Sequence, residues 1–217
     1  MSPNQPEYKD VEARIVRYDF DPRRASQIIE ALGYSKGSDG LFRDAANQKL
    51  SIDFRTVEGF DVHHKTLFPI ADAWQRTGVG VDAFVIPRVQ VVNPQYRATF
   101  PGLELLRNPN HMSRLLIYRS SQLRLPENNY LGSNYMNYQN DEWDTLLDRY
   151  FSTVPTRARN AVLADVMHHM TDRVIALPII YDVESFLIAH RVENMTPRNS
   201  NVRAPQGWNA HLWDIKG

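Results

Sequence analysis

Cysteine is absent from this chain of 217 residues. Its absence excludes disulfides, thiolate metal sites and cysteine nucleophiles at once. The chain also has no surplus of either charge, because 25 lysine and arginine residues balance 25 aspartate and glutamate residues. Nucleic acid is therefore not an expected partner, since binding its phosphates requires a basic excess.

Long apolar runs are lacking too. The longest, Val174 to Ile180, contains a proline and falls far short of the ~20 apolar residues that a membrane-spanning helix needs. The segment Met1 to Glu7 has neither the basic start nor the apolar stretch of a signal peptide. We expect no direct membrane span, and composition alone leaves the cellular location open.

Motifs typical of catalysis are equally scarce. The sequence has no Gly-x-Ser-x-Gly elbow, no His-Glu-x-x-His pair, no Gly-x-Gly-x-x-Gly turn and no phosphate-binding loop. Two pairs, His63-His64 and His168-His169, raise a metal-dependent hydrolase as an alternative. Adjacent residues point to different faces of a helix or strand, so each pair offers at most one ligand to a shared metal. We expect no enzyme activity, no cofactor and no bound metal.

Hydrophobic periodicity in the first half predicts alternating strands and helices. A helix is expected from Pro22, capped by Asp21 and closed by Gly33. After it comes a half-buried strand over 50–55, in which the inward Leu50, Ile52 and Phe54 alternate with the outward Ser51, Asp53 and Arg55. A helix over 66–77 follows. Strands over 79–86 and 103–106 complete the series. Strand, helix and strand at this spacing are typical of a crossover unit with parallel strands.

The second half predicts helices and short strands around a long loop. Residues 120–138 are rich in Asn, Tyr and Gly, which indicates an ordered surface loop. Asp141 is expected to cap one helix, and another should follow Pro155. Short strands are expected at 178–181 and 186–188. The fold class is thus α/β, a mixed sheet flanked by helices, with a predicted core of Leu50, Ile52, Phe54, Val81, Leu146, Leu147, Val162 and Val166.

Four sequence signatures occur in a fixed order. They are Asp21-Pro22-x-x-Ala25 leading to Gly33-Tyr34, Gly78-Val79-Gly80-Val81, Asn134-Tyr135-x-Asn137 before Trp143-Asp144-x-Leu146-Leu147, and Ala176-Leu177-Pro178-Ile179. Together they resemble the C-terminal lobe of family 5 extracellular solute-binding proteins, the receptors of oligopeptide-, dipeptide- and nickel-type ABC importers. The resemblance runs from about residue 18 to residue 213.

This resemblance implies a type II lobe with the periplasmic-binding-protein-like fold. Residues 1–17 would be an N-terminal linker, 18–182 the lobe, and 183–217 a segment returning toward a missing first lobe. The implied function is noncovalent capture of a peptide-like or other small polar solute in an interlobe cleft. The solute would pass to the membrane permease of an ABC importer. The implied location is periplasmic or extracellular, with the full-length protein anchored to the membrane as a lipoprotein.

The same lobes also occur fused to DNA-binding domains, so the ligand-sensing domain of a bacterial transcription regulator stays an alternative. A helix-turn-helix upstream would indicate the regulator, and a signal peptide with a lipid-attachment cysteine would indicate the receptor.

Candidate ligand-binding residues follow a strand end, where α/β folds place ligands. Arg107, Asn108 and Asn110 come after the strand over 103–106, although a plain Asx-Pro turn explains them nearly as well. Side-chain amides both donate and accept hydrogen bonds and so can orient a polar solute. Asn134 and Tyr135 lie in the polar-aromatic loop, which suits a sugar or peptide-like ligand or simple packing.

The resemblance adds His64, near the position of a basic residue that grips the peptide carboxylate in some members. It also implies an aspartate after the third strand for the peptide amino terminus. The matching stretch, Arg107 to Asn110, has no carboxylate. A peptide ligand is therefore not implied.

Overall fold

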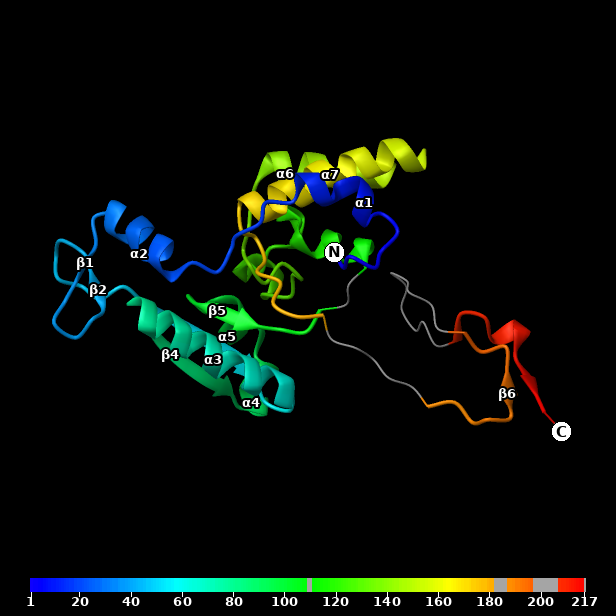
Figure 1. The fold of residues 1–217 in the computed structure, drawn as a ribbon, viewed down its shortest axis with the longest axis horizontal. Helices are drawn as coiled ribbons and strands as arrows, with labels where there is room; N and C mark the ends of the chain where they lie inside the picture. Colours follow the sequence, from blue (N-terminus) through cyan, green and yellow to red (C-terminus); the bar gives the residue numbers. More distant parts are fainter. Residues whose placement is uncertain (109–110, 182–186, 197–206, 217) are drawn as a thin grey trace. The chain divides into compact units, whose positions relative to one another are not determined.

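The computed structural model describes residues 1–108, 111–181, 187–196 and 207–216. The chain forms two compact units (Figure 1). One, which we call the sheet unit, contains residues 18–108 and 124–131. The other, the helical unit, contains residues 1–17, 109–123 and 132–217. Each is described by itself.

The sheet unit is built on three parallel strands. They are β3 (Ser51–Val57), β4 (Gly80–Ile86) and β5 (Leu103–Leu105), in the order β4-β3-β5. The central strand pairs Phe54 with Ala83 of β4 and with Leu103 of β5. The predicted crossover unit is confirmed, because α3 (Asp61–Thr77) connects β3 to its parallel neighbour β4.

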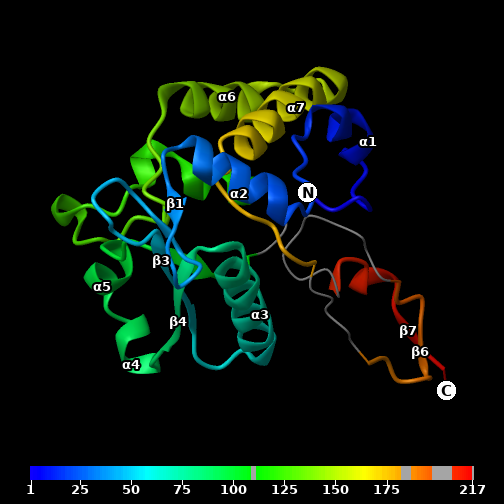
Figure 2. The same cartoon turned by 60° about the vertical axis from the view of Figure 1, so that its left-hand side comes forward.

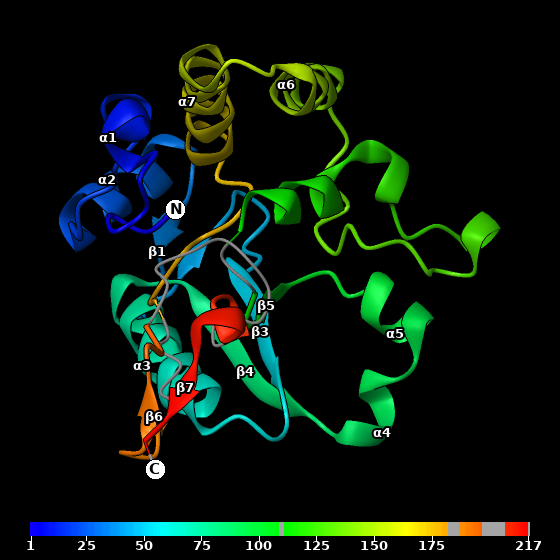
Figure 3. The same cartoon turned by 90° about the vertical axis from the view of Figure 1, so that its right-hand side faces the viewer.

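Helices cover both faces of this sheet, as Figure 3 shows. On one face lies α3, whose Trp74 ring stacks on Phe54 with centroids 5.5 Å apart. On the other lie α4 (Arg88–Val91) and α5 (Pro94–Ala98). The ring of Phe100, just after α5, meets Phe84 of β4 edge-on at 6.0 Å.

The first helix of the sheet unit, α2 (Pro22–Ala31), forms as predicted. The Asp21 carboxylate accepts hydrogen bonds from the amides of Arg23 and Arg24, each at 3.0 Å. Gly33 adopts φ +94°, the left-handed conformation that glycine takes without steric cost. Two short strands, β1 (Ser35–Lys36) and β2 (Phe42–Arg43), then pair antiparallel.

The helix predicted from residue 66 begins earlier, at Asp61. Pro69 consequently lies inside α3 and leaves the carbonyl four residues before it without a helical partner. The predicted end is confirmed, since Gly78 ends α3 with φ +114°. A Cβ there would lie 2.8 Å from the Phe42 ring, so glycine is needed for both conformation and space.

The predicted inside-outside alternation of the first strand is wrong at one residue. Arg55, expected on a solvated face, is 1% exposed. The reason is the position of β3 at the centre of a parallel sheet that has helices on both faces.

The helical unit centres on an antiparallel pair, α6 (Asp141–Ser152) and α7 (Thr156–Asp172). Its core includes Trp143, Leu147, Leu163 and Val166, each fully buried. Asn140, one residue before the predicted cap Asp141, caps α6 by accepting from the Trp143 amide at 2.8 Å. Of the eight predicted core residues in the chain, five are buried, and Leu50, Ile52 and Val81 are partly buried.

Residues 1–17, predicted to be a linker, instead pack on α7 (Figure 2). They form α1 (Tyr8–Val11) and the 3-10 helix η1 (Glu12–Arg14). Val11 is fully buried in the core. The Asp10 carboxylate accepts from the Asn160 amide at 2.6 Å, which fixes α1 at the start of α7.

The predicted loop over 120–138 is built from short 3-10 turns. They are η3 (Ser120–Gln122) in the helical unit and η4 (Pro126–Asn128) in the sheet unit. A further 3-10 helix, η2 (Met112–Tyr118), precedes the loop.

The predicted strand over 178–181 does not form. Leu177, Ile179, Ile180 and Tyr181 are between 44% and 58% exposed, and no strand pairs with them among the described residues. Of the strand predicted at 186–188, Phe186 lies outside the described residues and the other two residues are not extended in a sheet. An apolar run forms a strand only where a neighbouring strand satisfies its backbone.

The described part of the C-terminal segment contains β6 (Val192–Glu193) and β7 (Asp214–Ile215), paired antiparallel, and the 3-10 helix η6 (Ala210–Leu212). Buried Asn209 joins them. Its side-chain oxygen accepts from the Trp213 indole at 2.9 Å, and its amide donates to the Asn194 carbonyl at 2.6 Å.

Candidate functional site

The carboxyl end of the β3–β5 pair, where α3 begins, is held by a buried polar network. The Thr56 hydroxyl donates to the Leu105 carbonyl at 3.0 Å, which ties β3 to β5. The His63 Nδ1 lies 3.1 Å from the same hydroxyl oxygen. Since that hydroxyl proton points to Leu105, Nδ1 carries the proton and donates. We call this region the carboxyl edge.

His64 follows on the first turn of α3 and is only partly buried, unlike its 6% exposed neighbour His63. The two imidazoles thus point in different directions, as predicted for adjacent histidines. The Nε2 atom of His64 is inaccessible to water and has no hydrogen-bond partner in the described part of the chain. A buried ring nitrogen without a partner costs free energy until a ligand or water satisfies it.

Arg107 and Asn108 follow β5 at this edge, and both are exposed. Asn110, the third residue predicted here, lies outside the described residues together with Pro109. The structure therefore places His64, Arg107 and Asn108 at one end of one sheet unit.

Asn134 and Tyr135 belong to the helical unit. Asn134 is fully buried, and its amide donates to the carbonyls of Tyr118, Arg119 and Tyr138 at 3.3, 3.1 and 2.8 Å. Its oxygen accepts from the Met136 amide at 3.2 Å. The structure thus gives Asn134 a loop-organising role, whereas Tyr135 is 37% exposed.

An ion triad on the α5 side of the sheet was not predicted from the sequence. Arg55 donates through Nε and Nη2 to one Glu104 oxygen, at 2.9 and 2.7 Å. Arg97 of α5 donates to the other oxygen. The Arg55 guanidinium lies 3.6 Å from the Phe100 ring centroid. The triad attaches the short edge strand β5 to β3 and α5, and so supports the loop that starts at Arg107.

The second histidine pair lies on α7 and also diverges. His169 is 6% exposed, and its Nε2 lies 2.8 Å from the Tyr138 hydroxyl. Its ring stacks on Trp143 at 5.5 Å. Burial lowers the pKa of His169 below its ordinary value, and the Glu142 carboxylate, 3.6 Å from Nδ1, opposes that shift only in part. Arg173, Asp172 and His168 are the other charged or titratable groups that act on it.

His168 instead faces the N-terminal segment, where its Nδ1 donates to the Arg14 carbonyl at 3.0 Å. Neither pair gathers further ligands: the residues that the structure describes contain no group of three or more His, Cys, Asp or Glu side chains placed to hold a metal.

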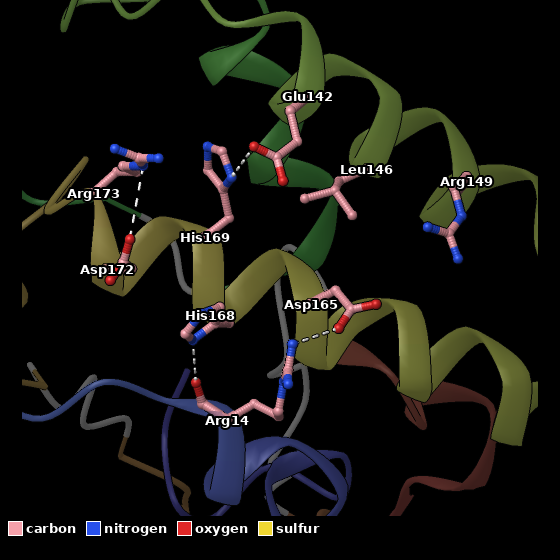
Figure 4. A pocket seen from close by; sticks show the side chains of 9 residues that line it. All are labelled: Arg14, Glu142, Leu146, Arg149, Asp165, His168, His169, Asp172 and Arg173. Atoms are coloured by element: carbon pink, nitrogen blue, oxygen red, sulfur yellow. Dashed lines mark hydrogen bonds and ion pairs between the residues drawn. The ribbon is translucent and has the colours of Figure 1, made fainter.

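A shallow groove of about 400 Å³ runs along α6 and α7 (Figure 4). It is lined by Arg14, Glu142, Leu146, Arg149, Asp165, His168, His169, Asp172 and Arg173. A second, apolar hollow of about 460 Å³ lies between α2 and α3. Within the described residues, no helix combines the length and apolar character needed to cross a membrane.

Comparison with solved structures identifies the fold. An oligopeptide-binding protein from Thermus thermophilus, complexed with a pentapeptide, is 19% identical with a TM-score of 0.69, over 82% of this chain and 32% of that one. A periplasmic oligopeptide-binding protein of an ABC transporter from Thermotoga maritima, bound to mannohexaose, is 21% identical with a TM-score of 0.69. The match covers 96% of this chain and 40% of that one. NikZ from Campylobacter jejuni, in complex with Ni(L-His), is 16% identical with a TM-score of 0.62. The match covers 74% of this chain and 32% of that one.

These likenesses confirm the predicted fold class. This chain folds like part of an oligopeptide- or nickel-binding protein. The chain spans about a third of the length of the first proteins it matches. The sequence matches no protein-family model and no curated protein.

Proposed function

We propose that this chain is the part of a solute-binding component of an ABC importer that supplies one wall of its binding cleft. It would capture a small polar solute without chemical change. The observation that supports this most is the carboxyl edge itself, where a parallel sheet with the fold of binding proteins presents His64, Arg107 and Asn108. Open parallel sheets bind ligands outside the carboxyl ends of their strands.

The edge offers complementary hydrogen-bonding groups. The Asn108 amide donates and accepts, and Arg107 donates from a fixed positive charge. The Nε2 of His64 is closed to solvent in this conformation, so a movement of the side chain would have to uncover it before it could accept from a solute. Asn110 is proposed to extend this set. No member is placed to act as a nucleophile with a base and an orienting group. The chemistry available at this edge is recognition.

The same groups support a proposal for the class of solute. The solved structures carry a pentapeptide, mannohexaose and Ni(L-His), which are all polar and rich in hydrogen-bonding atoms. The stretch Arg107 to Asn108 lacks a carboxylate to hold a peptide amino terminus. We therefore propose a solute recognised through acceptor groups, a class that includes peptides.

The remaining partners follow from the same proposal. The whole receptor would close a second lobe over the edge by a hinge movement and deliver the solute to a membrane permease. It would work in the periplasm or outside the cell, anchored to the membrane. One wall alone encloses only part of a ligand, so we expect this chain to bind more weakly than the whole receptor.

The test is a solute screen followed by variants of the edge. Ligand-observed NMR with a pentapeptide, mannohexaose and nickel–histidine identifies a binder, and its affinity is measured for His64→Ala and Asn108→Ala. Each should weaken binding by ~1–2 kcal/mol, because a polar partner is left unsatisfied. The matched control is Arg76→Ala, in an exposed ion pair at the opposite end of α3. Equal affinity in all variants would place the site elsewhere.

A further inference from the structure

The groove along α6 and α7 separates its charges along its length. The two helices are antiparallel, with Glu142 at the start of α6 facing His169 near the end of α7 at 3.6 Å. Arg149, two turns after Glu142, therefore lies toward the start of α7, on the side of Asp165. Figure 4 shows these side chains along one face, with Arg173 and Asp172 at the end away from Arg149.

The end near the start of α7 carries net positive charge. Arg14 pairs with Asp165 at 3.0 Å, which neutralises both. Arg149 adds a second guanidinium, and its side chain has no ion-pair or hydrogen-bond partner in the part of the chain that the structure describes. A guanidinium in this position can donate two parallel hydrogen bonds to a carboxylate.

The opposite end carries net negative charge. Glu142 and Asp172 contribute two carboxylates against the single guanidinium of Arg173. Arg173 lies 3.7 Å from Asp172 through Nε. The Glu142 side chain is 69% exposed, and its carboxylate lies 3.6 Å from the His169 imidazole, whose pKa is lowered by burial in favour of the uncharged ring. Glu142 is thus a carboxylate without a cationic partner among the described residues and can accept from an ammonium group.

The middle of the groove is neutral and fixed. Leu146 supplies an apolar floor, and His169 is held by Tyr138 and Trp143. His168 donates its Nδ1 proton to the Arg14 carbonyl, so its Nε2 is an acceptor beside the groove. Both helices and the N-terminal segment belong to one unit, so the two charged ends keep a constant separation.

We propose that this groove binds a small zwitterion with the length of a short peptide, because Glu142 and Arg149 lie seven residues, about 10 Å, apart along α6. Its carboxylate would lie at Arg149 and its ammonium group at Glu142. The site is separate from the carboxyl edge and does not rest on the function proposed for that edge. Its charged groups are exposed to solvent, so binding is weak and decreases with added salt.

The experiment is a titration of glycylglycine into the 15N-labelled chain, followed by amide chemical shifts. We expect saturable shifts on α6 and α7 between residues 142 and 173. N-acetylglycylglycine and glycylglycinamide, which each lack one charge, should bind about three- to ten-fold more weakly. Loss of the shifts in roughly 0.5 M salt would agree with an electrostatic site.

Arg149→Ala and Glu142→Gln should each reduce the affinity by a similar factor without changing the melting temperature, because both side chains are exposed. Arg157→Ala is the matched control, an exposed arginine of α7 outside the groove. Absence of shifts on α6 and α7, shifts confined to the sheet unit, or binding of the acetylated and amidated peptides as tight as that of glycylglycine would each overturn the proposal.

Discussion

Removing the carboxylate of Glu104 should destabilise the sheet unit far more than removing an exposed one. In Glu104→Ala the Arg55 guanidinium, 1% exposed, loses its two hydrogen bonds to a carboxylate. Breaking a buried ion pair from one side costs about 3–5 kcal/mol. The Phe100 ring and the Arg97 carbonyl, 3.4 Å from Nη2, stay in contact with the cation. We therefore expect the lower end, about 3 kcal/mol.

Native-state hydrogen exchange of the β3 amides measures this loss in the sheet unit alone. A loss of about 3 kcal/mol speeds the slowest amides more than a hundred-fold, at about 1.4 kcal/mol per ten-fold. Asp72→Ala is the control. The side chains of Asp72 and Arg76, which form an ion pair, are 56% and 79% exposed, so the pair contributes at most about 1 kcal/mol. Equal acceleration in the two variants, or less than about ten-fold in Glu104→Ala, would refute the reasoning.

Three further predictions concern stability. Burial lowers the pKa of His169 in the folded chain, so as the pH falls the unfolded chain binds a proton at this imidazole before the folded chain does. The contribution of the neutral His169 to the free energy of unfolding is therefore full above about pH 6.5 and decreases as the pH falls below that value. Melting curves of His169→Gln should show a smaller loss of stability over the same pH range. Asn134→Ala removes the donor to the Tyr138 carbonyl, while the carbonyls of Tyr118 and Arg119 keep the Trp143 indole and the Gln122 amide as donors. The variant should cost about 1–3 kcal/mol in urea unfolding, and a cost below about 0.5 kcal/mol would contradict the loop-organising role of Asn134. Gly102→Ala would place a Cβ 2.1 Å from the Asp53 carbonyl oxygen and should lower stability by about 1–3 kcal/mol, measured as a lower melting temperature; an unchanged value would refute this contact.

Elements with strong local signals were predictable from the sequence. Asp21 and Gly33 bound α2, and Gly78 ends α3, because capping and left-handed turns depend on a few neighbouring residues. The parallel crossover followed from the order and spacing of strands and helix. The Arg55 prediction failed because alternation along a strand assumes one solvated face, and the central strand of this sheet has none.

The parts that depend on distant contacts were not predictable. The helix α1 is held by Asn160 and by the core around Val11, and nothing in its own short sequence indicates this. The Arg55–Glu104 pair joins residues 49 positions apart. At the site, the strand-end rule predicted Arg107 and Asn108 at the carboxyl edge, but it could not show that the Nε2 of His64 lacks a partner among the described residues.

The central claim is that a polar solute binds at the carboxyl edge of the sheet unit. The most direct measurement is an amide-shift map of the labelled chain with the solute that the screen identifies. We expect saturable shifts centred on His64, Arg107 and Asn108, which disappear in Asn108→Ala and persist in Arg76→Ala. Saturable binding that leaves these three residues unshifted, or no binding by any solute, would contradict it.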